Sequence, residues 1–177
     1  MFYSKGAHHM KKLFQVTAGI LVLAAACKPL KMDAYEKNLE IPGHDWAYDY
    51  KPSFEVNIQP EDTASLYDIY VNVRHTDAYP YSNMWLLVGT TYPGDSIPKE
   101  QRVELPLADI SGKWSGTGTS GIIKHDDIIE HRVPIQHNAI FNKPGTYKFT
   151  FEQNMRQNPL PHVMNVGLRI SKAGKRP

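Results

Sequence analysis

The sequence predicts an all-β fold: an antiparallel β-sandwich (jelly-roll-like) of about eight strands, after an N-terminal lipoprotein signal peptide. From Trp46 onward, apolar side chains recur at every second position, which is the period at which strand residues share one face. Turn-forming residues separate these runs, and no segment keeps a helical period. Many short strands at this spacing are typical of two packed antiparallel sheets, with a closed barrel as the alternative.

The expected strands follow in order along the chain. Residues 54–58 alternate cleanly, and Tyr67, Ile69, Val71 and Val73 share one face of the next strand, 67–74. The remaining candidates are 83–91, 102–107, 121–125, 128–134, 145–153 and 163–171. Proline- and glycine-containing turns at 59–62, 92–95, 111–112 and 143–145 separate them.

The first 26 residues have the charged, apolar and small-residue order of a secretory signal peptide. Lys11 and Lys12 precede an apolar run at 13–23 and three alanines, and Cys27 follows directly. This order predicts a bacterial lipoprotein in which Cys27 carries the lipid, with ordinary cleavage after 24–26 as the alternative. The apolar run is shorter than the roughly 20 residues of a membrane-spanning helix.

These features divide the chain into four parts. Residues 1–26 form the signal peptide, with 1–9 preceding the better start at Met10. Residues 27–43 form a lipid-anchored tether, 44–171 the sandwich domain and 172–177 a basic tail. Acyl chains on Cys27, palmitate among them, would hold the protein at the cell envelope. Lys28, in the place of an aspartate, favours the outer membrane, and the side that the domain faces stays open.

Composition excludes several classes of function. Removing residues 1–26 leaves 17 basic and 18 acidic residues, which is not the charge balance of a nucleic-acid-binding protein. Cys27 is the only cysteine, so no disulfide is expected. No Gly-x-Ser-x-Gly motif is present, and nothing pairs the carboxylates for hydrolysis. We therefore expect no enzyme, no catalytic residues and no cofactor.

Two further segments resemble ligand sites only superficially. The glycine-rich stretch 112–121 lacks the Gly-Lys-Ser/Thr ending of a phosphate loop, so we expect a tight crossing between sheets with Trp114 packed over it. An exposed Trp114 that stacks on a sugar or a partner is the alternative.

His125, His131 and His137 lie close in sequence but lack zinc-ligand spacing, so we expect a solvated hairpin rim and no metal site.

The segment 74–86 concentrates large amphipathic side chains. Aromatic residues and arginine are the usual anchors of protein interfaces, although a folded strand connection explains the same residues. The candidate contact residues here and elsewhere in the chain are Arg74, Tyr79, Tyr81, Trp85, Trp114 and Arg156.

A family resemblance rests on motifs in a fixed order. They are the signal ending in Cys27, HDW at 44–46, YPYSNMWL at 79–86, LAD at 107–109, GKWSGTG at 112–118, GTY at 145–147, QNMR at 153–156 and VGLRI at 166–170. Together they resemble the GldH-type gliding-motility lipoproteins of Bacteroidetes. The resemblance implies an envelope lipoprotein associated with other gliding-motility proteins and with the type IX secretion machinery, and it supplies no catalytic residues. The residue three before Cys27 is Ala24, where the family pattern has leucine.

Three hypotheses follow. The leading one is a non-enzymatic interaction module, anchored to the membrane through Cys27, that docks other gliding-motility or type IX secretion envelope proteins. The alternative is a carbohydrate- or glycan-binding sandwich that uses exposed aromatic rings. The third, a hydrolase, requires titratable groups that converge in one pocket.

Overall fold

A computed structural model of the protein describes residues 32–116 and 128–177. Eight strands and two short 3-10 helices make up this part of the chain: β1 (Ala34–Glu40), η1 (Pro42–His44), β2 (Ser53–Ile58), η2 (Pro60–Ala64), β3 (Ser65–Thr76), β4 (Asn83–Thr91), β5 (Lys99–Pro106), β6 (Ile128–Ala139), β7 (Gly145–Gln153) and β8 (Val163–Lys175). No helix in these residues is long and apolar enough to cross a membrane.

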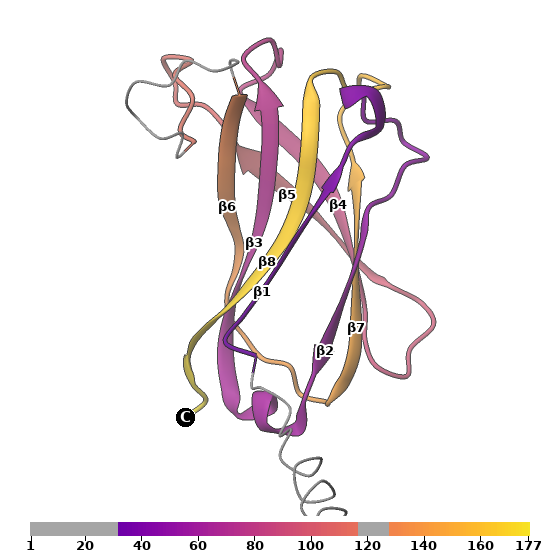
Figure 1. Ribbon diagram of the computed structural model, residues 1–177, viewed down its shortest axis with the longest axis vertical. Helices are drawn as coiled ribbons and strands as arrows, with labels where there is room; N and C mark the ends of the chain where they lie inside the picture. Colours follow the sequence, from indigo (N-terminus) through magenta and orange to yellow (C-terminus); the bar gives the residue numbers. More distant parts are fainter. Residues whose placement is uncertain (1–31, 117–127) are drawn as a thin grey trace, which may run out of the picture. The chain divides into compact units, whose positions relative to one another are not determined.

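The strands form two four-stranded sheets with the order β1-β8-β3-β6 in the first and β2-β7-β4-β5 in the second (Figure 1). Every pairing is antiparallel. This order, in which each sheet takes strands from both halves of the chain, is that of an eight-stranded jelly roll. The prediction of an all-β antiparallel sandwich is therefore confirmed.

The core lies between the inward faces of the two sheets. In β3, Tyr67, Ile69, Val71 and Val73 all point inward and are almost fully buried, as the alternation of the sequence predicts. In β7, the aromatic residues at 147, 149 and 151 do the same from the second sheet. Aromatic rings therefore supply much of the apolar area that stabilises a domain whose described residues contain no cysteine.

The prediction of a tether at 27–43 is wrong for residues 34–40, which form β1 and pair with β8. Only Tyr35 and Leu39 in β1 are partly buried and pack on the core. An edge strand with two apolar side chains gives a weak period-2 signal. β8 likewise continues to Lys175, through part of the predicted basic tail. The expected strand 121–125 lies outside the described residues.

The two ends of the sandwich differ in composition. We call one the η2 end: it contains η2, the 140–144 turn, the 92–98 loop and residues 172–177. The opposite one, the Trp114 end, contains η1 and the loops at 77–82, 107–116 and 154–162. Figure 1 shows β3, β6 and β8 running between these two ends. All six predicted contact residues lie at or near the Trp114 end, since Arg74 is close to the end of β3 and Trp85 is close to the start of β4.

Candidate functional site

A buried pair of histidines lies beneath the Trp114 end. His75 is the last inward-facing residue of β3, and His131 faces it from β6, where it pairs with Val73. Their Nε2 atoms are 2.9 Å apart, and both residues are buried, with exposed fractions of 0% and 4%. The rings stack at 5.0 Å between centroids. The neighbouring strands β3 and β6 therefore place two imidazoles in one hydrogen bond.

The neighbouring contacts fix the tautomers of both rings. His75 Nδ1 is 2.8 Å from the carbonyl oxygen of Thr76, which can only accept, so this nitrogen carries the proton. A neutral His75 then accepts at Nε2, and the Nε2–H of His131 donates to it. Burial lowers the pKa of His75, and burial together with the charge of His75 lowers the pKa of His131 to about 4. The pair is therefore neutral at pH 7.

Trp114 covers this pair from the 107–116 loop. Its ring meets His75 edge-on at 4.6 Å between centroids, and its Nε1–H donates to Asp77 Oδ1 at 2.7 Å. A short bridge to Ala108 holds its backbone. The half-buried indole thus closes the Trp114 end from one side, which agrees with the expected packing role. Its ring is in contact with other rings and is not a free platform for stacking.

A tight turn presents the tip of the same loop to solvent. Asp109 Oδ1 accepts hydrogen bonds from the backbone N–H groups of Ser111 and Lys113 and from the Ser111 hydroxyl. These bonds hold the pKa of Asp109 below its usual range. Gly112 has a φ of +82°, a backbone conformation that favours glycine. The turn leaves the side chain of Ile110 fully exposed at the tip.

Two tyrosines extend the ring cluster toward the 154–162 loop. Tyr79 is buried, packs 5.0 Å from His75 between ring centroids and donates its hydroxyl to the carbonyl oxygen of Asn83. Burial raises the pKa of Tyr79. Tyr81 meets Tyr79 edge-on, and its hydroxyl donates to Gln157 Oε1 at 2.8 Å. Ring contacts and hydrogen bonds therefore link the 77–82, 107–116 and 154–162 loops.

The other three predicted residues are placed differently. Trp85 lies on the outer face of β4, with the guanidinium of Arg102 4.2 Å above its ring. Arg74 lies on the outer face of β3, and its Nε forms an ion pair of 2.6 Å with Glu130 Oε1 without the alignment of a hydrogen bond. Arg156 is exposed on the 154–162 loop. The structure thus unites Tyr79, Tyr81 and Trp114, and not all six candidates.

A polar network on the outer face of the first sheet was not predicted. Glu36 of β1 accepts hydrogen bonds from Asn72 at 2.8 Å, from Arg132 at 2.9 Å and from Arg169. Burial opposes the ionisation of Glu36, but these bonds and the neighbouring charges outweigh it and lower its pKa. The network joins all four strands, since its members come from β1, β3, β6 and β8. It secures the edge strand that the sequence analysis missed.

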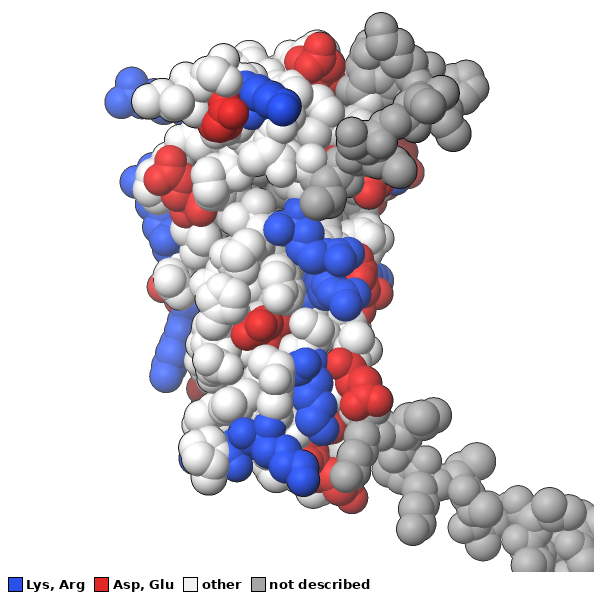
Figure 2. All heavy atoms as spheres, turned by 90° about the vertical axis from the view of Figure 1, so that its left-hand side faces the viewer, with Lys and Arg blue, Asp and Glu red and all other residues white. Residues whose placement is uncertain are grey.

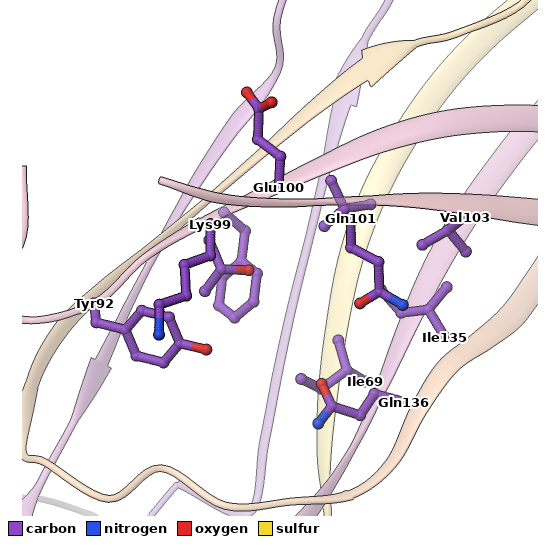
Figure 3. Close-up of a pocket in the computed structure, with 11 residues that line it drawn as sticks. Ile69, Tyr92, Lys99, Glu100, Gln101, Val103, Ile135 and Gln136 are labelled. Atoms are coloured by element: carbon purple, nitrogen blue, oxygen red, sulfur yellow. The ribbon is translucent and has the colours of Figure 1, made fainter. Parts of the chain in front are cut away.

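A separate cavity opens between the free edges of β5 and β6 (Figure 3). It has a volume of about 260 Å³ and an apolar floor that includes Ile69, Val103 and Ile135. Lys99 lies at the mouth with its ammonium 5.0 Å from the centroid of the Tyr92 ring, and Glu100 points away from the cavity. None of the six candidate contact residues lines it.

The histidines named in the sequence analysis have separate surroundings. His131 pairs with His75, whereas His137 is exposed and lies 3.3 Å from Asp68; His125 lies outside the described residues. Within residues 32–116 and 128–177, no three His, Cys, Asp or Glu side chains are placed to hold a metal ion. The glycine-rich stretch is described only as far as Gly116, which packs so closely on β6 that a Cβ there would overlap the Glu130 carbonyl oxygen.

Comparison with known proteins identifies relatives of the whole domain. The gliding motility lipoprotein GldH homolog of Christiangramia forsetii is 28% identical over 175 residues, covering 93% of this chain and 99% of the relative. The gliding motility lipoprotein GldH of Flavobacterium johnsoniae is 27% identical, covering 88% and 96%. A solved structure of tomato aspermy virus covers 94% of this chain and 96% of its own, at 10% identity and a TM-score of 0.30, which is too low to bear on the fold. The sequence model of the GldH lipoprotein family matches residues 33–170, and the chain therefore belongs to the GldH lipoprotein family.

Proposed function

We propose that this protein is a lipid-anchored, non-enzymatic interaction module of the cell envelope that serves gliding motility. The observation that carries this proposal is the family match, which spans residues 33–170 and so includes nearly the whole sandwich. Both relatives described above are named as gliding motility lipoproteins. We further propose that its partners are other gliding-motility or type IX secretion envelope proteins.

The Trp114 end is our candidate for the docking surface. Buried and half-buried rings give it a rigid base, and the fully exposed Ile110 projects from it on a tightly hydrogen-bonded turn. Preorganised aromatic and apolar groups of this kind supply most of the binding energy in protein interfaces. Tyr81 and Arg156 lie on the adjoining loops and would contact the same partner.

Cys27 carries the anchor in this proposal. The order of charged, apolar and small residues before it is that of a lipoprotein signal, and membership of a lipoprotein family supports the same reading. Its sulfur and its new amino terminus would carry acyl chains, palmitate among them. Each methylene that these chains bury in the bilayer would contribute about 0.8 kcal/mol to the free energy of membrane binding. We place the anchor in the outer membrane because Lys28 follows Cys27.

Glycan binding remains the alternative function, but the aromatic residues first considered for it are engaged elsewhere. The Trp114 ring packs on His75, and its N–H is bonded to Asp77. The ring of Tyr92, which lines the cavity between β5 and β6, has Lys99 over it. A sugar would have to displace these contacts before it could stack on either ring.

A crosslinking pull-down from native membranes tests the proposal. The wild-type lipoprotein is compared with Ile110→Asp, and the matched control is Gln101→Asp, which adds the same charge at an exposed position of β5. We expect mass spectrometry to identify gliding-motility or type IX secretion proteins with the wild type and the control, and a loss of these proteins with Ile110→Asp. Retention of cell-surface glycan without any such protein would instead favour the alternative function.

A further inference from the structure

The described chain begins at the η2 end, where it is firmly attached to the sandwich. The backbone N–H of Met32 donates to Asp62 Oδ1 at 3.1 Å, and Asp62 is a buried residue of η2. The next residue, Asp33, accepts a hydrogen bond from the backbone N–H of Lys172 at 3.0 Å, and β1 then pairs with β8. Any force on the preceding segment therefore acts directly on the η2 end.

The distance between this attachment and Cys27 is short. Met32 follows Cys27 by five residues, and an extended chain spans at most about 3.6 Å per residue, or about 18 Å in total. The 12 residues of β3 run from the η2 end to the Trp114 end, and a strand rises about 3.3 Å per residue, which gives about 40 Å. A lipid on Cys27 would keep the η2 end, and not the Trp114 end, near the membrane.

The η2 end carries side chains that suit a membrane surface. Lys143, Lys172, Lys175 and Arg176 are exposed there, and Arg176 is held against the 140–144 turn by a hydrogen bond to Asn142. The exposed acidic residues at this end are Asp33, Glu61 and Asp95. Figure 2 shows Lys and Arg side chains over the lower part of one face, with acidic side chains beside them and further Lys and Arg side chains higher on the same face.

Exposed apolar side chains accompany these charges. Ile97 is 78% exposed on the 92–98 loop, and Ile140 and Tyr92 are also exposed. This loop lies at the η2 end because Pro93 packs against the position where Gly145 would carry a Cβ, and Tyr92 meets the ring of Tyr147. Basic groups attract anionic headgroups, while tyrosine and isoleucine enter the interface between headgroups and acyl chains.

We infer that the η2 end is a membrane-docking surface whose partner is anionic phospholipid, and that it holds the Trp114 end about 40 Å away from the bilayer. This inference rests on the proposed lipidation of Cys27. The lipid alone would let the domain tumble on its short tether. The basic and apolar groups of the η2 end add a second contact that keeps the domain upright and its opposite end accessible to a protein partner.

Fluorescence quenching on vesicles tests the orientation. The full lipidated chain carries a fluorophore at Ala173→Cys or at Ile110→Cys, which are exposed positions at the η2 and Trp114 ends. Because Cys27 is the only natural cysteine and would be lipidated, the new thiol is the one that is labelled. With vesicles of phosphatidylcholine and phosphatidylglycerol that contain a headgroup-level quencher, we expect strong quenching at 173 and little at 110.

Charge reversal separates docking from simple tethering. Lys172→Glu/Lys175→Glu should reduce quenching at 173 to the level seen with phosphatidylcholine alone, because each lysine near an anionic surface changes binding about fivefold. The matched control Lys113→Glu/Arg156→Glu changes the net charge equally at the other end and should leave quenching unchanged.

Two outcomes would overturn the inference. One is equal quenching at 173 and 110, and the other is quenching at 173 that does not depend on phosphatidylglycerol or on the charge reversal. Loss of protein partners at the Trp114 end would not alter this pattern, so the two proposals fail separately.

Discussion

The buried histidine pair should make the stability of the domain depend on pH between about 6.5 and 4. An unfolded histidine titrates near pH 6.5, whereas burial and the neighbouring ring lower the pKa of folded His131 to about 4. As the pH falls through this window, the unfolded chain binds a proton that the folded chain does not, so acidification favours unfolding. The stabilisation is complete above pH 6.5 and is lost toward pH 4.

The size of the effect follows from the difference in pKa. About 2.5 units at 1.36 kcal/mol each give about 3 kcal/mol from His131 alone. His75 acts in the same direction, since burial also lowers its pKa. Because folded domains are commonly stable by only about 5–15 kcal/mol, this loss should be visible as a clear shift of the urea midpoint.

The assay is urea unfolding at pH 7, 6, 5 and 4.5, followed by tryptophan fluorescence. The test variant is His75→Leu/His131→Leu, which replaces both partners with side chains of similar volume and leaves no imidazole unpaired. We expect it to flatten the pH dependence over this range. His137→Gln, which removes an exposed histidine beside Asp68, should keep the wild-type slope. A flat wild-type profile, or an unchanged slope in the double variant, would show that the histidine pair does not set the pH dependence of stability.

Three further predictions concern the sheet edge, the ring cluster and the anchor. Gly167→Ala should destabilise the fold by about 1–3 kcal/mol, because a Cβ at this position would overlap Asn38 Oδ1 on β1. The loss is measured as a lower urea midpoint, and an unchanged midpoint would contradict the close packing of β1 on β8. Trp114→Ala should lower the free energy of unfolding by about 2 kcal/mol, which is roughly half the loss for a fully buried tryptophan. If thermal unfolding shows a loss of under about 0.5 kcal/mol, the ring lies in solvent and does not pack on the histidine pair. Cys27→Ala should release the domain from membranes or leave an uncleaved precursor without unfolding it, and a processed, membrane-bound product in cell fractionation would exclude Cys27 as the anchor.

The sequence was most informative where strands are half-buried. The alternation of β3 and β7 follows directly from the need of each strand to bury one face, and it predicts which residues form the core. β1 escaped detection because its attachment depends on Gly167 and on a network of side chains from three other strands. Such long-range partners leave no periodic signal in the edge strand itself.

The candidate site was predictable only in part. The concentration of aromatic residues in 74–86 and the tryptophan in the glycine-rich stretch were visible in the sequence, and the structure joins Tyr79, Tyr81 and Trp114. The alternation of β3 also places His75 on the buried face. Its partner His131 comes from a strand 56 residues away, and only the jelly-roll topology brings the two rings together. Trp85 turned outward because it occupies the face of β4 opposite to Met84 and Leu86.

Site-specific photo-crosslinking in cells shows which end of the sandwich contacts a protein partner. A photoreactive residue is placed at position 110, on the exposed tip of the Trp114 end, or at position 97, on the exposed loop of the η2 end. After irradiation of intact cells, adducts are isolated and identified by mass spectrometry. We expect position 110 to capture a gliding-motility or type IX secretion envelope protein and position 97 to capture none. Capture of such a protein from position 97, with none from position 110, would contradict this expectation.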